Sequence, residues 1–151
     1  GQPPLYLRAG DLVPLLRPTI DTLAPTTMPG INAGEVDSYA SSPGRLTVRT
    51  SAGPSHELVL FDKTTLGRQE LAGTMTLSFE PGDEFVFGAI FEVVALGSAP
   101  TSVMDQQGEV PMLDTAALAE VDRGWSFELA EFGGTLRVVI GSGNADVTIV
   151  R

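Results

Sequence analysis

The chain has 151 residues, of which 42% are hydrophobic and 19% charged, a composition typical of a globular protein with a real core rather than of a disordered one. Its formal net charge of −10 disfavours nucleic acids and anionic membrane surfaces as partners, because binding to either depends on clustered Lys and Arg. The absence of Cys excludes disulfides, thiolate catalysis and Cys-ligated metal sites, and no apolar run approaches the roughly 20 residues of a membrane-spanning helix.

The chain opens with two apolar, strand-like runs joined by the turn sequence Arg8-Ala9-Gly10-Asp11. It begins in such a run and without Met, so we expect it to be part of a longer polypeptide. The next stretch, from Arg17 to Ala40, is rich in Pro, Gly and Thr and has no clear period. A loop of this length in a compact domain is uncommon and usually functional. We expect the opening strand and this loop to lie against a neighbouring domain.

From residue 46 onward, most segments alternate between apolar and polar residues, which is typical of strands with one buried face. A longer apolar run, 85–96, predicts a central strand bent at Gly88, and a short helix is expected at 114–121. The other predicted strands are 46–50, 56–61, 74–79, 125–129, 135–140 and 146–150. Turn-forming residues separate them, so the sequence predicts an all-β, antiparallel β-sandwich.

Two arrangements of this sandwich stay open: two small packed sandwich subdomains, or one sandwich with a long N-terminal extension. For the first arrangement we expect a proximal region with the long loop at 1–68 and a distal domain at 69–151.

The opening segment, through Leu15, resembles the one that follows the catalytic barrel in glycoside hydrolase family 31, the α-glucosidases and α-xylosidases. There a strand, an Arg-x-Gly turn and a second strand lead into a C-terminal β-sandwich. Residues 99–110 and 124–149 are similar to the distal part of that region. Phe61-Asp62 stands where the family has a Tyr-x-Asp-Asp-Gly turn, without the Asp-Gly. The family's nucleophile motif, Trp-x-Asp-Met, has no match, so no catalytic residue is carried over.

The resemblance implies a non-catalytic C-terminal region of a bacterial family 31-like enzyme, which stabilises the catalytic barrel or packs on it. Its partner is then its own barrel or another subunit, and the expected interface residues are Leu5, Tyr6, Leu12 and Leu15. Two alternatives stay open: a stand-alone carbohydrate-binding module, and a structural or adhesion β-sandwich protein.

Carbohydrate binding usually needs exposed aromatic side chains as stacking platforms. Tyr39, in the loop-like region, is the best candidate, whereas Trp125 and Phe127 alternate along a strand and are expected to face the core.

We expect no cofactor, metal or catalytic residue in this chain. The acidic residues fall in turns or on the solvent positions of strands, and the single histidine, His56, is expected to be structural or at the surface. Glu80, Asp83 and Glu84 flank a Pro-Gly turn, for which turn formation is a better explanation than calcium binding.

Overall fold

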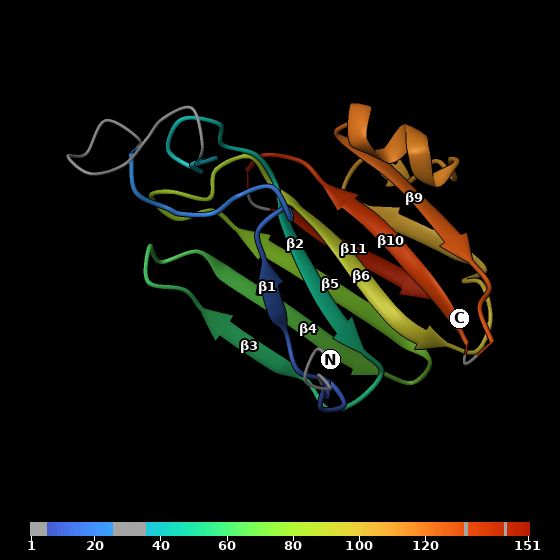
Figure 1. The fold of residues 1–151 in the computed structure, drawn as a ribbon. Coiled ribbons are helices and arrows are strands. Elements are labelled where there is room, and N and C mark those ends of the chain that lie inside the picture. Colours follow the sequence, from blue (N-terminus) through green and yellow to red (C-terminus); the bar gives the residue numbers. More distant parts are fainter. Residues whose placement is uncertain (1–5, 26–35, 132, 144) are drawn as a thin grey trace.

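The computed structural model describes residues 6–25, 36–131, 133–143 and 145–151, which form a single β-sandwich (Figure 1). One layer is a five-stranded sheet in the order β1 (Val13–Leu15), β2 (Leu46–Ser51), β6 (Ala89–Leu96), β10 (Gly134–Ile140) and β9 (Arg123–Glu128). The other is a six-stranded sheet in the order β3 (His56–Val59), β4 (Thr65–Leu71), β5 (Thr74–Glu80), β11 (Ala145–Val150), β7 (Ser102–Asp105) and β8 (Gly108–Glu109). The prediction of an all-β sandwich is confirmed.

Both sheets contain strands from the regions before and after the expected division at 68/69. That division falls inside β4, and β2 from the first region lies beside β6 from the second. The described residues therefore correspond to the second arrangement that the sequence left open, one sandwich, rather than to two subdomains. The reason is that the strands cross between layers, so neither region can bury its apolar faces alone.

The strand pairing is antiparallel except between β2 and β6, which run parallel with Leu46 beside Ala89 and Ser51 beside Val94. Among the described strands, the sandwich is thus antiparallel apart from this one pair. Between these two strands the chain forms β3, β4 and β5 in the opposite sheet. This long crossover is what allows β6 to enter beside β2 in the same direction.

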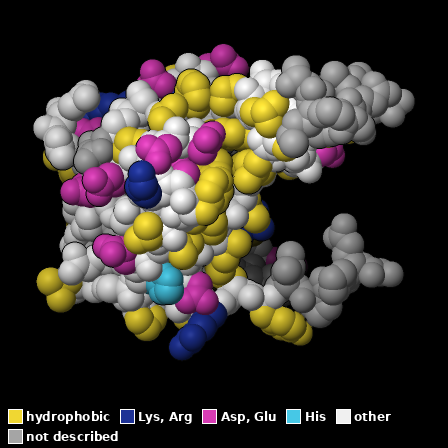
Figure 2. Space-filling view, turned by 90° about the vertical axis from the view of Figure 1, so that its left-hand side faces the viewer, with side chains coloured by type: hydrophobic (Ala, Val, Ile, Leu, Met, Phe, Trp, Pro, Cys, Tyr) yellow, Lys and Arg dark blue, Asp and Glu magenta, His cyan; other side chains and the backbone are white. Residues whose placement is uncertain are grey.

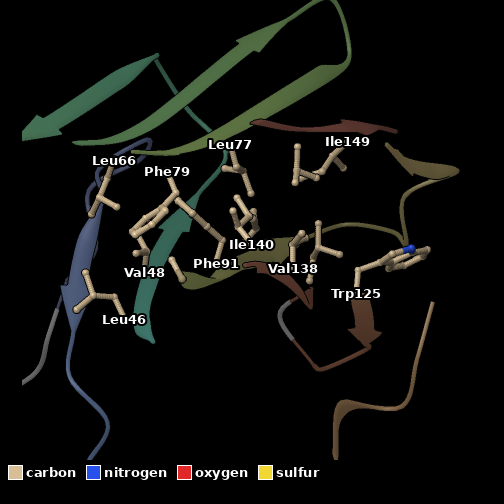
Figure 3. Close-up of a cluster of buried hydrophobic side chains, with 14 of the residues drawn as sticks. Leu46, Val48, Leu66, Leu77, Phe79, Phe91, Trp125, Val138, Ile140 and Ile149 are labelled. Atoms are coloured by element: carbon tan, nitrogen blue, oxygen red, sulfur yellow. The ribbon is translucent and has the colours of Figure 1, made fainter. Parts of the chain in front are cut away.

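The core lies between the sheets, where alternating side chains from both layers meet (Figure 3). Val48 of β2, Phe91 of β6 and Val138 of β10 contribute from the five-stranded sheet, and Leu77 and Ile149 from the six-stranded sheet; each is at most 1% exposed. Burial of these side chains removes apolar area from water and supplies most of the driving force for folding.

The other side chains labelled in the core are Leu46, Leu66, Phe79, Trp125 and Ile140, and each is also buried. Trp125 is 7% exposed and its Nε1 donates a hydrogen bond to the Val110 carbonyl oxygen at 3.0 Å, so the indole is both buried and satisfied. Phe127 packs against the same core, as expected.

The predicted central strand begins later than the sequence indicates. β6 starts at Ala89, directly after Gly88, which has a φ of 89°. A Cβ at Gly88 would lie 2.2 Å from the Ile140 carbonyl oxygen, so only glycine fits this turn into the strand. Residues 85–87 instead form part of a loop at one end of the sandwich. The predicted helix at 114–121 is a 3-10 helix, η1 (Thr115–Glu120), without a side-chain hydrogen bond from Asp114 at its cap.

Candidate functional site

The two side edges of the sandwich differ in how they are closed. At the β9–β8 edge, the chain after β8 pairs with β9: Trp125 N donates to the Pro111 carbonyl oxygen at 3.0 Å and Leu113 N to the Trp125 carbonyl oxygen at 2.8 Å. Arg123 of β9 adds two hydrogen bonds to the Asp105 carboxylate in the opposite sheet, at 2.6 and 2.9 Å. This edge is therefore sealed by the chain itself.

The opposite edge lies between β1 and β3, and among the described residues no segment pairs with the outer side of either strand. Its gap is filled by half-buried apolar side chains, Leu16 and Ile20 after β1 and Leu58 and Leu60 on or after β3. Figure 2 looks onto this end of the molecule and shows hydrophobic side chains gathered in a band across it. An edge of this kind is a natural place for another domain to pack.

Exposed apolar side chains continue from this open edge onto β1. Val13 and Leu15 are 38% and 36% exposed and lie opposite Arg49 and Thr47 on the outer face of the five-stranded sheet. Tyr6, ahead of β1, is 90% exposed. We call Tyr6, Val13 and Leu15 the β1 patch. Pro14, in the centre of β1, has no N–H to donate, so the patch is suited to packing through side chains rather than to the addition of a strand.

The turn before β1 is held by a close contact between two backbones. Gly10 has a φ of 81°, and a Cβ there would lie 2.4 Å from the Pro54 carbonyl oxygen. The same carbonyl accepts a hydrogen bond of 2.9 Å from Arg68 Nη1, and the Gly53 carbonyl accepts another at 2.5 Å. Arg68 thus ties the β2–β3 turn to β4, and the Arg-x-Gly turn at the start of the chain packs on it.

Arg68 is a buried cation with a carboxylate partner. Its side chain is fully buried, and Nη2 pairs with Glu70, which also pairs with Arg151. Burial lowers the pKa of the Arg68 guanidinium, and the nearby positive charge of Arg151 lowers it further. Arg68 Nε has no hydrogen-bond partner among the described residues. Breaking this pair would leave an uncompensated buried charge.

A second apolar area lies at the loop end of the same edge, around Phe61 just after β3. Phe61 is 73% exposed, and its ring packs edge-on against the buried Phe85, with centroids 5.9 Å apart and an interplanar angle of 80°. Phe85 in turn meets Tyr39 edge-on at 5.2 Å. A hollow of about 240 Å³ opens beside these rings, lined by Leu23, Pro25, Tyr39, Ala40, Phe61 and Glu84.

The carboxylate of Asp62 fixes the two loops that carry this area. It accepts hydrogen bonds from Thr64 N (3.1 Å), Thr64 Oγ1 (2.7 Å), Glu84 N (3.1 Å) and Phe85 N (3.0 Å). Burial alone would raise the pKa of Asp62, but these hydrogen bonds to its charged form outweigh burial, so its pKa is lowered. Asp62 therefore holds Phe61 and Glu84 in a fixed relation.

The outer faces of the sheets differ in charge. On the five-stranded sheet, Glu92 accepts from Arg49 Nη2 at 2.8 Å and from Arg137 Nε at 3.1 Å, and Arg137 also pairs with Glu128 at 2.6 Å. Burial opposes ionisation of Glu92, but the two guanidinium groups outweigh it and its pKa is lowered. Asp105, paired with Arg123, also has a lowered pKa. These are carboxylates held in their charged form by partners.

The outer face of the six-stranded sheet is acidic and rich in hydroxyl groups. A hollow of about 450 Å³ there has Glu57, Ser78 and Asp146 among its lining residues, and an adjoining hollow of about 290 Å³ shares these three. Glu57, Ser78 and Asp146 belong to one row across the strands, since Gly67 lies opposite both Glu57 and Ser78 and Asp146 lies opposite Ser78. Such a surface repels polyanions.

The structure places the predicted interface residues in different environments. Tyr6 and Leu15 are exposed, as an interface requires, whereas Leu12 is 6% exposed and belongs to the core, so its assignment to the surface is wrong. Leu12 is buried because it lies next to β1 on the side that faces the second sheet. Leu5 lies outside the described residues.

Tyr39 is not the exposed aromatic that the sequence indicates, because it is 5% exposed. The backbone of its loop folds onto the core through Tyr39 N, which donates to the Thr22 carbonyl oxygen at 2.9 Å, and the phenol donates to the Gly44 carbonyl oxygen at 2.7 Å. Burial raises the pKa of the phenol, which therefore stays neutral. Tyr39 is among the residues that line the hollow beside Phe61, and its role in ligand binding stays a prediction.

The described residues contain no group of three or more His, Asp or Glu side chains placed to hold a metal ion. His56 is exposed, with Nδ1 3.8 Å from Asp11 Oδ1. In the described part of the chain there is also no helix with the length and apolar character required to cross a bilayer.

Comparison with solved structures shows where this fold occurs. A cycloalternan-forming enzyme from Listeria monocytogenes, solved with a pentasaccharide substrate, matches 95% of the chain with a TM-score of 0.64 and 15% identity. A GH31 dextranase from Flavobacterium johnsoniae, solved with glucose, matches 95% with a TM-score of 0.59 and 10% identity. The chain has the fold of one small part of each enzyme.

The chain spans only 13% of the cycloalternan-forming enzyme and 19% of the dextranase. At these identities the likeness shows the fold alone. The family 31 resemblance of the sequence is thus confirmed at the level of the fold. No protein-family model matches the chain, and no curated protein sequence does so either.

Sequence reasoning missed the exposed Phe61 and the neighbouring Glu84. Phe61 stands in a run of alternating residues, which predicts a strand continuing to residue 61, but β3 ends at Val59 and the chain turns, with Lys63 N donating to the Leu60 carbonyl oxygen at 3.0 Å. The one available signal was the Asp-Lys-Thr-Thr sequence that follows, since Asp and Thr form turns through side-chain hydrogen bonds to the backbone.

Proposed function

We propose that this chain is the non-catalytic C-terminal β-sandwich region of a glycoside hydrolase family 31-like enzyme, and that it packs on the catalytic barrel of that enzyme. The observation that carries the proposal is the match of 95% of the chain to a segment making up only 13–19% of two carbohydrate-acting enzymes. Most of each enzyme therefore lies outside the matched segment.

The state of the carboxylates supports a non-catalytic role. A glycosidase needs one carboxyl group with a raised pKa as general acid, beside a second that stays ionised. Among the described residues, each carboxyl group whose pKa is clearly shifted is shifted downward, by hydrogen bonds from Arg and Thr side chains and from backbone N–H groups: Asp62, Glu92, Asp105 and Glu128. These side chains stabilise turns and sheet faces.

The open edge of the sandwich supports packing on another domain. The β1 patch adjoins the half-buried side chains that fill the gap between the sheets, and contact with a second domain would remove this apolar area from water. The β9–β8 edge is already covered by the chain after β8, and the outer face of the five-stranded sheet carries the ion pairs of Glu92 with Arg49 and Arg137. We infer that the barrel covers the β1 patch.

The first test is the size of the native polypeptide. An antibody against this chain should detect a band several times heavier than 15.9 kDa in extracts of the source organism. A band near 15.9 kDa would refute the proposal, because a polypeptide of that size has no room for a barrel.

The second test addresses the interface in the longer enzyme. The double change Val13→Thr and Leu15→Thr should lower the thermal midpoint of the enzyme and leave KM unchanged, because the β1 patch stabilises the barrel without touching substrate. Leu71→Thr is the matched control, since Leu71 is 74% exposed in the β4–β5 hairpin, away from the patch. Equal midpoints for the enzyme and the double variant would exclude this surface as the interface.

A further inference from the structure

The hollow beside Phe61 combines an exposed aromatic ring, a second ring that restrains it and an exposed carboxylate. Phe61 is 73% exposed, although exposure of a large apolar side chain to water does not stabilise the folded chain. Its ring contacts Phe85 at an interplanar angle of 80°, which restrains its orientation while most of the Phe61 side chain stays exposed. Glu84, on the other loop, lines the same hollow and has no hydrogen bond or ion pair from its carboxylate to any described residue.

We propose that this hollow binds one pyranose unit of a neutral carbohydrate, with the face of Phe61 stacking on the sugar ring and Glu84 accepting hydrogen bonds from its hydroxyl groups. A pyranose has an apolar face of C–H groups and a rim of hydroxyls, so it matches an aromatic face flanked by a carboxylate. The volume of about 240 Å³ is below the ~300–1,000 Å³ of pockets that enclose drug-sized ligands, which suits a single ring.

The local charge decides between kinds of ligand. Asp62 and Glu84 lie on the two loops. Of the described cations near them, Lys63 is exposed and paired with Asp83 at 2.9 Å. Arg17, whose charge acts on Tyr39, is paired with Asp37 at 3.9 Å, so negative charge prevails around the hollow. An anionic sugar would be repelled. An apolar protein surface that covered the hollow would remove water from the Glu84 carboxylate and offer no hydrogen-bond donors in its place. Burial of a charged group without such donors costs a large amount of free energy. A neutral sugar replaces that water with hydroxyl donors.

The hollow is organised before any ligand arrives. Asp62, which follows Phe61 in sequence, accepts hydrogen bonds from Glu84 N and Phe85 N, so the stacking ring and the acceptor are held by one buried carboxylate. Leu23 and Pro25 form a further apolar part of the lining. A rigid site loses less entropy on binding, which makes a small contact area useful.

The test is affinity electrophoresis of the 151-residue chain in native gels cast with dextran or with amylopectin, two neutral glucans. We expect retardation of the wild-type chain in at least one gel. Phe61→Ser should weaken the apparent affinity by roughly threefold or more, in line with the loss of an aromatic contact. Glu84→Gln should weaken it as well, since an amide oxygen is a poorer acceptor than a carboxylate.

Two control variants distinguish loss of binding at the hollow from the loss of any exposed apolar side chain or carboxylate. Val59→Ser removes another exposed apolar side chain (60% exposed) shortly before Phe61, and Glu80→Gln removes another exposed carboxylate before Glu84; neither residue lines the hollow. Both should migrate like the wild type. Circular dichroism should show that Phe61→Ser is fully folded at the temperature of the gel, with a midpoint lowered only by the loss of the contact with Phe85, because Phe61 is mostly exposed.

Absence of retardation in both gels would overturn the proposal, as would equal retardation of wild type and Phe61→Ser. Loss of retardation in Val59→Ser as well would show an unspecific apolar effect and also overturn it. The result is independent of the family 31 proposal, because it is measured on the chain by itself and does not depend on the mass of the native polypeptide.

Discussion

Asp62 and Phe85 lie 23 residues apart in the chain, and the carboxylate of Asp62 accepts a hydrogen bond of 3.0 Å from the backbone N–H of Phe85. The same oxygen accepts from Glu84 N, so one buried side chain joins the loop after β3 to the loop before β6. The exposed aromatic ring and the edge of the sandwich beside it both depend on this connection.

Replacement of Asp62 by Asn should lower the free energy of unfolding by about 1–3 kcal/mol, because an amide cannot accept all the hydrogen bonds that the carboxylate accepts and leaves buried N–H groups unsatisfied. Urea denaturation of the chain measures this. Asp83→Asn is the control, since Asp83 pairs only with the exposed Lys63 and should be nearly neutral. Equal losses in the two variants would contradict a special role for Asp62.

The Asp62 carboxylate also makes the stability of the chain depend on pH. The pKa of Asp62 is lower in the folded chain than in the unfolded chain, where it is about 3.9. Its contribution to stability is therefore complete above about pH 5 and is lost as the pH falls through the folded pKa. The difference in unfolding free energy between wild type and Asp62→Asn should shrink between pH 5 and pH 3. A difference that stays constant over this range would show that the charge is not responsible.

The sequence predicted the strands whose apolar residues alternate, and it failed where a polar residue faces inward. β4 was not expected because Gly67 and the buried Arg68 interrupt the apolar pattern. Arg68 is acceptable there only because Glu70 and two backbone carbonyls lie within reach, which the sequence does not reveal. Tyr39 was expected at the surface because its loop has no period, but pairing of that loop with Thr22 carries the ring into the core.

The candidate sites were predicted only in part for the same reason. The apolar opening of the chain indicated a contact surface, and Tyr6 and Leu15 are exposed, but which leucine of the segment turns inward depends on the pairing of β1 with β2. The exposure of Phe61 depends on where β3 ends, which is set by the turn around Asp62 rather than by the alternation of the strand.

Substitution of Gly10 can show whether the turn before β1 is held by its backbone contact with Pro54. Three glycine-to-alanine substitutions separate the cost of the Cβ contact from the cost of left-handed backbone for alanine. Gly97→Ala meets no atom within 4 Å and should be nearly neutral. Gly73→Ala also meets no atom, but its φ of 84° should cost about 1 kcal/mol, since left-handed backbone is unfavourable for alanine. Gly10→Ala, with a similar φ and a Cβ 2.4 Å from the Pro54 carbonyl oxygen, should cost more than Gly73→Ala. Thermal denaturation gives the order, and equal losses at Gly10 and Gly73 would show that the turn can move away from Pro54.

The β1 patch predicts that the chain by itself self-associates. Tyr6 is 90% exposed, and Leu15 is exposed next in the chain to the half-buried Leu16 of the open edge. Contact between two copies would remove this apolar area from water. Sedimentation velocity at increasing concentration should show a rising average mass for the wild-type chain and a constant, monomeric mass for the double variant Tyr6→Ser, Leu15→Ser. Leu71→Ser should behave like the wild type, because Leu71 is as exposed as a patch residue but lies in the β4–β5 hairpin. A monomeric wild-type chain at high concentration would show that the patch is too small to drive association, and the inferred barrel contact would then need apolar surface beyond these residues.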